Sequence, residues 1–237
     1  MKTETIQISI ILPVFSETSS LVQTVADIKT VISPDCLKEI IIIVSPKSNK
    51  ESVEICERLA IQDPFIHYYI QQNNPGVGWA FREAFEKVQG THVLMMACDG
   101  ETDPKVIPLM IEKAKLTRCD IVISNRWIQG GGFQGYGYLR MIFNYIFQRI
   151  IGLLYRSAIS DYTYAYRLYK IETLKGCSWR ETRHPFLLES LLRPLKKGFT
   201  VEQVPAVWHP RTEGKSKNTI LQNFYYFRTA LKIYFER

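Results

Sequence analysis

The first half of the chain alternates short, uniformly apolar runs with longer stretches in which apolar residues recur every three or four positions. The runs have the length of buried strands, and the spacing has the period of helices. We expect strands at residues 6–12, 40–44, 67–70, 93–97 and 120–125. We expect helices at residues 16–32, 48–61, 79–88 and 104–116, the second opened by a capping box from Ser48 to Glu51. This alternation predicts an α/β fold with a mostly parallel central sheet flanked by helices.

The second half has a different pattern. Residues 130–137 are too rich in glycine to hold one regular element. Residues 139–155 form an expected amphipathic helix whose apolar stripe consists of Ile142, Phe143, Ile146, Phe147, Ile150, Ile151 and Leu154, with Arg140, Asn144, Gln148 and Arg149 off it. Such a stripe packs into the core, the commoner arrangement, or lies in a membrane interface. Residues 220–237 repeat the pattern, and two basic, aromatic amphipathic stretches favour a role at a membrane surface.

Length and charge narrow the class of protein. A chain of 237 residues with 46% hydrophobic content can bury one substantial core, so we expect a single domain over residues 1–237, with a nucleotide-binding half (1–125) and an acceptor half (126–237). The net charge of +7 is uneven, because basic residues outnumber acidic ones by more than two to one from Arg126 onward. This surplus predicts a phosphate-carrying partner, which is a nucleotide, an anionic membrane or a nucleic acid.

Cysteine usage indicates a reducing compartment. The five cysteines are scattered and form no CxxC pair, which argues against a disulfide framework and against a zinc site. The start of the chain lacks the pattern of a signal peptide, and no uninterrupted apolar window is long enough for a spanning helix. We therefore expect a cytoplasmic protein.

The segment from His92 to Pro104 carries the candidate chemistry. Asp99 and Glu101 follow the apolar run at 93–97, and ligands of open α/β sheets bind outside the carboxyl ends of the strands. Because the two acids are two positions apart, an extended backbone directs both carboxylates to one side. Two hard oxygen ligands suit Mg²⁺ or Mn²⁺. The alternative is that Asp99 belongs to a plain turn and that Asp103 only caps the following helix.

The order of motifs along the chain resembles that of inverting glycosyltransferases of family 2, which have the GT-A fold, and in particular the dolichyl- or polyprenyl-phosphate mannose synthase type. The resemblance covers nearly the whole chain. The matching segments are residues 11–17 (LPxYNE), 74–80 (GxGxA), 96–104 (DxD and proline), 125–127 (TRYxxGG), 160–169 (SDxxSGFRLY), 186–189 (FxxE), 204–205 (VP) and 211–217 (RxxGxSK).

The resemblance implies a role for each matched position. Pro13, Phe15, Glu17, Ser45 and Gly76 would border the nucleotide-sugar donor. Asp99 and Glu101 would hold Mg²⁺ or Mn²⁺ as a Lewis acid on the leaving diphosphate. Arg211 and Lys217 would close over that diphosphate.

The acceptor side follows in the same way. Arg126 and Arg140 would face the phosphate of a lipid acceptor, with Asn144 one helical turn from Arg140. A phosphate oxygen is anionic near neutral pH and needs no base. A hydroxyl acceptor on a glycan or lipid would need one, and Asp161 and Glu189 are the candidates.

Some positions depart from the family pattern. Ala97 stands in place of the first aspartate of the DxD motif, Ser45 in place of an aspartate that contacts the base or ribose, and Tyr164 in a triplet that lacks the usual glycine. Ala97 and Ser45 keep open a third hypothesis, a non-catalytic relic that binds a nucleotide or a partner protein. The leading hypothesis is sugar transfer to a polyprenyl-phosphate-type lipid by an enzyme peripheral to the cytoplasmic membrane face. Nucleic-acid binding ranks lowest, because the basic residues follow the phosphate-loop positions rather than an aromatic-interleaved stripe.

Overall fold

A seven-stranded sheet organises the molecule. The computed structural model describes residues 5–73, 76–213 and 220–236, without the side chains of 220–223. The strand order is β3-β2-β1-β4-β7-β5-β8. The strands are β1 Ile8–Val14, β2 Leu37–Val44, β3 Ile66–Ile70, β4 His92–Met95, β5 Ile121–Asn125, β7 Arg167–Lys170 and β8 Val201–Pro205. All neighbours pair in parallel except β7, which is antiparallel to both β4 and β5.

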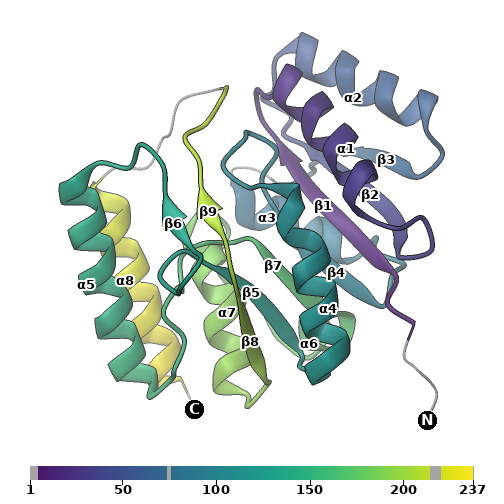
Figure 1. Ribbon diagram of the computed structural model, residues 1–237. Helices are drawn as coiled ribbons and strands as arrows, with labels where there is room; N and C mark the ends of the chain where they lie inside the picture. Colours follow the sequence, from purple (N-terminus) through teal and green to yellow (C-terminus); the bar gives the residue numbers. More distant parts are fainter. Residues whose placement is uncertain (1–4, 74–75, 214–219, 237) are drawn as a thin grey trace.

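Helices cover both faces of this sheet (Figure 1). They are α1 Ser19–Val31, α2 Lys50–Gln62, α3 Val77–Phe85, α4 Ile107–Thr117, α5 Tyr138–Tyr155, α6 Ile171–Lys175, α7 Pro185–Lys196 and α8 Ile220–Phe235, with a 3-10 turn η1 at Pro104–Val106. The short strands β6 Gly132–Phe133 and β9 Val207–Trp208 pair with each other outside the main sheet.

Alternate residues of the strands feed two separate cores. Ile10 and Ile42 pack with α1, α2 and α4 on one face. Ile11 and Ile43 pack with α3, α7 and the inner side of α8 on the other. Because successive strand residues point to opposite faces, a strand that is apolar at every position must be covered on both sides. This confirms the predicted α/β fold with a largely parallel sheet.

Some local predictions differ from the structure. The capping residue of α2 is Asn49, whose side chain accepts a hydrogen bond of 2.7 Å from the amide of Ser52, so the predicted capping box from Ser48 is wrong. An asparagine one position later offers the same oxygen to the free amides of the first turn. The glycine-rich stretch at 130–137 contributes the short strand β6.

Helix α5 turns a polar residue toward the protein and leaves apolar residues at the surface. Gln148, placed off the apolar stripe, is only 3% exposed, whereas Leu139, Phe143 and Leu153 are 65–81% exposed. Of the two arrangements left open for the apolar stripe, each applies to part of it: Ile151 packs into the core, whereas Phe143 and Ile146 lie at the surface. Gln148 faces inward because its amide finds buried partners: it donates to Thr163 Oγ1 at 2.7 Å and accepts from the amide of Tyr162 at 2.7 Å.

Helix α8 lies beside α5 (Figure 1) and also leaves aromatic residues outside. Its buried positions are Tyr226, Thr229, Ala230 and Ile233, while Phe224, Tyr225 and Phe235 are exposed. None of the helices in the described ranges is both long and apolar enough to cross a membrane.

Candidate active site

The carboxyl ends of β1, β2 and β4 meet at one edge of the sheet. The amide of Ser45, just after β2, donates to the carbonyl of Val14 at 2.9 Å. The thiol of Cys98, just after β4, lies 3.4 Å from the carbonyl of Pro13. Three predicted donor-site positions, Pro13, Ser45 and Asp99, are thereby brought to this edge, as parallel strands require.

Asp99 and Glu101 lie together at this edge. The amide of Glu101 donates to Asp99 Oδ1 at 3.0 Å, which closes the turn between them. The side chain of Asp99 is nearly buried and that of Glu101 is about one-fifth exposed. Burial, followed by the negative charge of Glu101, raises the pKa of Asp99 to about 6. Two carboxylates held this close in a poorly solvated place require a cation.

Arg211 supplies that cation in the structure. Its Nε lies 2.7 Å from Glu101 Oε1 and 3.1 Å from Asp99 Oδ2. One positive group thus bridges both carboxylates. In the described ranges no three His, Cys, Asp or Glu side chains lie close enough to hold a metal by themselves. The donor set of two carboxylates fits Mg²⁺ or Mn²⁺, which commonly use one or two carboxylates together with substrate phosphates.

Two tyrosines outside the predicted set hold the acidic turn in place. Tyr164 donates its hydroxyl to the carbonyl of Glu101 at 2.8 Å, and Tyr166 donates to the carbonyl of Asp103 at 3.0 Å. The alternating tyrosines at 162, 164 and 166 are the sequence signal that would have pointed to them. Asp103 caps η1 through the amide of Lys105 at 2.9 Å, so this acid has the capping role of the alternative interpretation.

Two more of the predicted donor-side residues, Glu17 and Gly76, have defined local contacts. Glu17 folds back to accept the amides of Phe15 at 2.6 Å and Ser16 at 2.9 Å. Gly76 has φ +126 and approaches the backbone at Thr182 so closely that no Cβ fits there. Asn74, Pro75 and Lys217 lie outside the described residues.

Arg126 and Asp161 form a buried, two-pronged ion pair. Arg126 donates from Nε to Asp161 Oδ2 at 2.7 Å and from Nη2 to Oδ1 at 2.8 Å. The amides of Thr163 and Tyr164 also point at Asp161, so both of its oxygens are occupied. The Arg126 guanidinium lies over the rings of Tyr164 (4.7 Å) and Phe133 (5.0 Å). Tyr164 therefore contacts both this pair and the acidic turn.

Helix α5 brings the remaining predicted acceptor residues beside this pair. Asn144 lies 3.5 Å from Thr163 Oγ1 and accepts from Gln148 at 3.0 Å. Arg140 is exposed, with its guanidinium 5.7 Å from the ring of Tyr136. Gln148 was not predicted as a site residue, and its position in a helix of apolar neighbours is the only sequence signal for it.

Glu189 belongs to a different cluster. Its buried carboxylate accepts the amides of Arg180 and Glu181 and pairs with Arg193 Nε at 2.5 Å. Arg193 continues to Glu236 at 2.6 Å, which ties α7 to the end of α8. Within the described residues Glu189 makes no hydrogen bond or ion pair with Asp99 or Glu101, so the structure does not bring this predicted residue to the strand-end site.

Residues 211–213, here called the strap, cross the site. Arg211 contacts the two carboxylates as described above. The amide of Thr212, the next residue, donates to the carbonyl of Asp99 at 2.9 Å. Glu213 accepts hydrogen bonds from Thr18, Ser19 and Ser20 at the start of α1. Burial alone would raise the pKa of Glu213, but these donors, with Ser19 foremost, outweigh it and lower the pKa to about 2.

Comparison with known proteins gives the fold and the family. Glucosyl-3-phosphoglycerate synthase from Mycobacterium tuberculosis, crystallised with Mn²⁺, UDP and phosphoglyceric acid, superposes with a TM-score of 0.74 over 98% of this chain and 79% of that chain, at 14% identity. The polyprenol monophosphomannose synthase of Mycolicibacterium smegmatis is 24% identical over 215 residues, which cover 88% of this chain and 79% of the relative.

Glycosyltransferase AglD of Haloferax volcanii is 23% identical over 216 residues, covering 89% of this chain and 34% of AglD, so the chain spans about a third of that relative. Residues 9–176 match the family model described as Glycosyl transferase family 2. This match includes all of β1 but its first residue, the acidic turn and the Arg126–Asp161 pair. The chain belongs to glycosyl transferase family 2 and has the GT-A fold.

Proposed function

We propose that this enzyme transfers a sugar, with inversion, from a nucleotide-sugar donor to a polyprenyl-phosphate-type lipid at the cytoplasmic membrane face. The observation that carries the proposal is the carboxylate pair Asp99–Glu101 at the strand ends, already bridged by one cationic group. Asp99 and Glu101 would hold Mg²⁺ or Mn²⁺, which when bound supplies Lewis-acid stabilisation of the leaving nucleoside diphosphate. The Mn²⁺ and UDP bound by the glucosyl-3-phosphoglycerate synthase support this assignment.

The residues around the pair have distinct roles in the proposal. Pro13, Phe15, Glu17, Ser45 and Gly76 would border the donor. Arg211, once released from the carboxylates, would neutralise the diphosphate, and a guanidinium suits phosphate oxygens because it donates two parallel hydrogen bonds. Lys217, outside the described residues, is assigned to the same task.

The state of the two candidate bases supports a phosphate acceptor over a hydroxyl. Both oxygens of Asp161 are engaged by Arg126, and those of Glu189 by main-chain amides and Arg193. A base must reach the acceptor proton with a free lone pair. A phosphate oxygen attacks without giving up a proton and needs no such group. The name of the polyprenol monophosphomannose synthase supports the same acceptor class.

The acceptor would approach from the side of α5. Arg140 is exposed and Asn144 is half-buried on this helix, next to the Arg126–Asp161 pair. In the proposal, Arg140 contacts the acceptor phosphate directly. Arg126 does not bind the acceptor phosphate in the proposal, because its charge is already neutralised by Asp161. Its role is to hold the residues that line the acceptor side in position.

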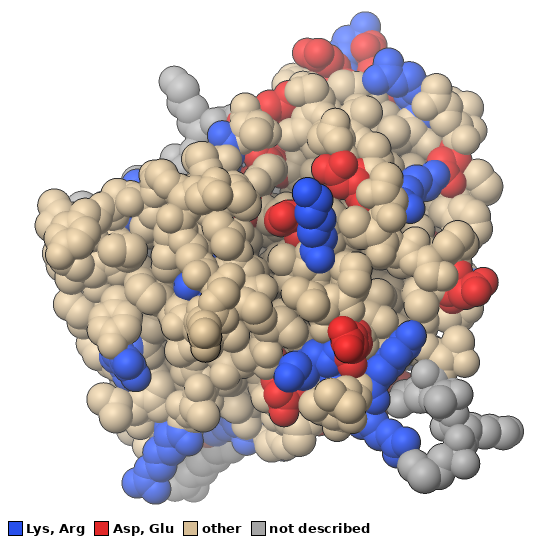
Figure 2. Space-filling model, in the orientation of Figure 1, with Lys and Arg blue, Asp and Glu red and all other residues tan. Residues whose placement is uncertain are grey.

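The exposed apolar side of α5 and α8 supports contact with a membrane. Residues 121–160 contain no acidic residue, and in Figure 2 the side occupied by α5 shows a few Lys and Arg and no Asp or Glu. An unpartnered apolar face with basic residues beside it is the pattern of an interfacial helix. The exposed side chains that would enter the lipid include Leu139, Phe143, Ile146, Ile150, Leu153, Phe224 and Phe235.

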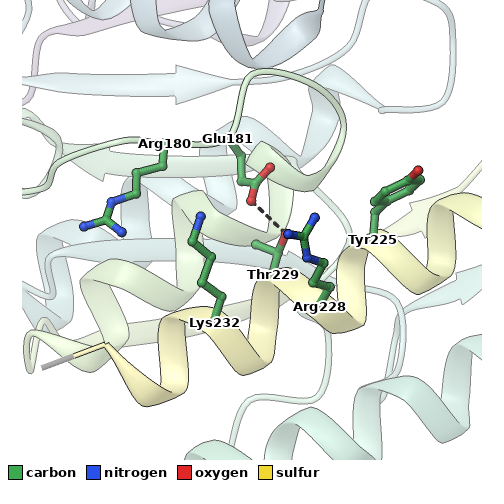
Figure 3. A pocket seen from close by; sticks show the side chains of 6 residues that line it. All are labelled: Arg180, Glu181, Tyr225, Arg228, Thr229 and Lys232. Atoms are coloured by element: carbon green, nitrogen blue, oxygen red, sulfur yellow. Dashed lines mark hydrogen bonds between the residues drawn. The ribbon is translucent and has the colours of Figure 1, made fainter.

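A basic pocket of about 200 Å³ borders the same face. Arg228 and Lys232 of α8 point toward the loop that carries Arg180 and Glu181, and Thr229 donates to Glu181 at 3.0 Å (Figure 3). Long cationic side chains at the rim of an apolar face suit the phosphates of lipid headgroups.

All five cysteines are unpaired, which supports the reducing, cytoplasmic side of the membrane.

A transfer assay tests the proposal. The full chain is incubated with a panel of radiolabelled nucleotide sugars and polyprenyl phosphate, with Mn²⁺ or with EDTA, and labelled lipid is extracted. We expect transfer with one donor, dependent on Mn²⁺ and lost in Asp99→Asn. Labelled product from a polyprenol or glycan hydroxyl, but none from polyprenyl phosphate, would replace the proposed acceptor. Absence of both transfer and nucleotide binding would reject the enzyme assignment, whereas nucleotide binding without transfer and without metal dependence would indicate a relic.

A further inference from the structure

The carboxylate pair and the strap form a closed set of contacts. A single nitrogen, Arg211 Nε, lies within hydrogen-bond distance of both Asp99 and Glu101. A divalent ion sits about 2.1 Å from carboxylate oxygens. An ion on these same two oxygens would overlap the position of Nε. Arg211 and the metal therefore compete for one place.

Glu213 fixes the other end of the strap. Helix α1 has no acidic residue in its first turn and no side-chain cap of its own. Glu213, distant by 195 positions from Thr18, accepts the amides of Thr18 at 2.7 Å and Ser19 at 3.0 Å together with the hydroxyls of Thr18, Ser19 and Ser20. A carboxylate at a helix N-terminus satisfies free amides and the helix dipole together.

Thr212 leaves little freedom between these two anchors. Its amide and its hydroxyl both donate hydrogen bonds to the carbonyl of Asp99, at 2.9 Å and 3.2 Å. It also packs against Gly100, where φ is +90. Three consecutive residues thus hold the acidic turn, its carboxylates and α1, so the position of Arg211 is set by Glu213.

We infer that Arg211 is the resident cation of the Asp99–Glu101 pair, that a divalent ion must displace it, and that Glu213 is the positioning residue that holds Arg211 in competition with the metal. The inference rests on the proposed metal site. Its consequence is an antagonism between a docked strap and a bound metal. The strap leaves the carboxylates when the metal arrives, which frees Arg211 for an anionic ligand.

Metal binding without any nucleotide tests this inference. Mn²⁺ is titrated into the full chain by calorimetry, for the wild type, Glu213→Gln and Arg211→Gln. We expect both variants to bind Mn²⁺ about tenfold more tightly, which is the usual size of a coupling between two sites. The Glu213 variant is the sharper one, because removing a nearby negative charge would by itself weaken cation binding, whereas release of the strap strengthens it.

Two matched controls separate the strap from general charge effects. Lys105→Gln removes a positive charge near the acidic turn without touching the pair, and Glu112→Gln removes an exposed acid on α4. Both should leave the Mn²⁺ affinity within about twofold. Arg211→Gln leaves the cap of α1 intact, so it keeps the test valid if Glu213→Gln fails to fold.

The outcomes separate this inference from the proposed function. Unchanged or weaker Mn²⁺ binding in Arg211→Gln, or in a folded Glu213→Gln, overturns the inference while sugar transfer stands or falls separately. Tighter binding in both variants supports it even if no sugar is transferred. Absence of Mn²⁺ binding in every variant overturns it, because the pair would then hold only Arg211.

Discussion

The hydroxyl of Tyr164 donates a 2.8 Å hydrogen bond to the carbonyl of Glu101, and its ring lies 4.7 Å from the Arg126 guanidinium. One buried side chain thus joins the proposed metal turn to the buried ion pair of the acceptor side. The relationship predicts that the two halves of the site depend on each other.

Replacing Tyr164 by Phe should loosen the acidic turn. We expect Mn²⁺ binding to weaken about threefold to tenfold and the free energy of unfolding to fall by about 1 kcal/mol, because one hydrogen bond is lost and the ring remains. Calorimetry and urea unfolding measure the two effects. Tyr68→Phe removes an exposed hydrogen bond to Glu57 and is the control for metal binding. Unchanged Mn²⁺ affinity in Tyr164→Phe would contradict this role.

Metal binding should depend on pH through Asp99. Burial and the charge of Glu101 raise its pKa to about 6, so the carboxylate is ionised above pH 6 and protonated below it. Because a proton and a metal compete for the same oxygens, the Mn²⁺ dissociation constant should rise about tenfold per pH unit below 6. Calorimetry between pH 5 and 7.5 measures this slope. A flat profile across that range would show that Asp99 does not bind the ion.

Glu213 should make the fold sensitive to acid. Its pKa falls from the ordinary 4.5 to about 2 in the folded chain. A lowered pKa means that the folded state favours the charged form, so the stabilisation is complete above pH 4.5 and is lost as the pH falls toward 2. Glu213→Gln should lack this part of the acid-induced decline in melting temperature. Parallel curves for wild type and variant between pH 5 and 2 would contradict the assignment, and Glu112→Gln serves as control.

The Arg126–Asp161 pair should be essential for stability. Asp161→Asn leaves the buried Arg126 without its counter-charge, and breaking such a pair costs about 3–5 kcal/mol. Urea unfolding measures the loss. Adding Arg126→Met to Asp161→Asn should restore part of it, since the stranded charge is then gone. A double variant no more stable than Asp161→Asn would show that the loss has another source.

The apolar face of α5 should govern membrane binding. Phe143→Ser and Leu153→Ser change side chains that are 65% and 81% exposed, so the free energy of unfolding should change by less than about 0.5 kcal/mol. Together they should lower binding to anionic liposomes about tenfold or more, because each replaces an apolar side chain that would be buried in the lipid. Leu116→Ser, 78% exposed on α4, is the matched control. Equal liposome binding by the wild type, the Phe143→Ser/Leu153→Ser double variant and Leu116→Ser would reject α5 as the membrane contact.

The sequence predicted what depends on local pattern and failed where distant residues decide. The strand that ends before Asp99 and the helix start at Pro104 follow from neighbouring residues, and both were confirmed. The burial of α5 stayed open between core and surface, because the amphipathic pattern defines two faces without saying which one the protein covers. The hydrogen bonds of Gln148 with Thr163 and with the amide of Tyr162 turn the face that carries Gln148 toward the protein.

The strap was beyond sequence reasoning for a similar reason. Arg211 was expected over the diphosphate from the family pattern, and the structure places it on Asp99 and Glu101. Glu213 gave no signal, because its partners at the start of α1 lie almost the whole chain away. A side-chain cap from such a distance becomes visible only when the sheet brings both segments to one edge.

The reversed direction of β7 determines where the chain can tolerate change. Since β7 runs against β4 and β5, the residues that enter it, Asp161 to Tyr166, arrive at the edge where its neighbours end. The turn that leaves it, into α6, opens on the opposite rim. That rim is remote from the acidic turn, whereas a single added residue ahead of Arg167 would shift the tyrosines that support this turn.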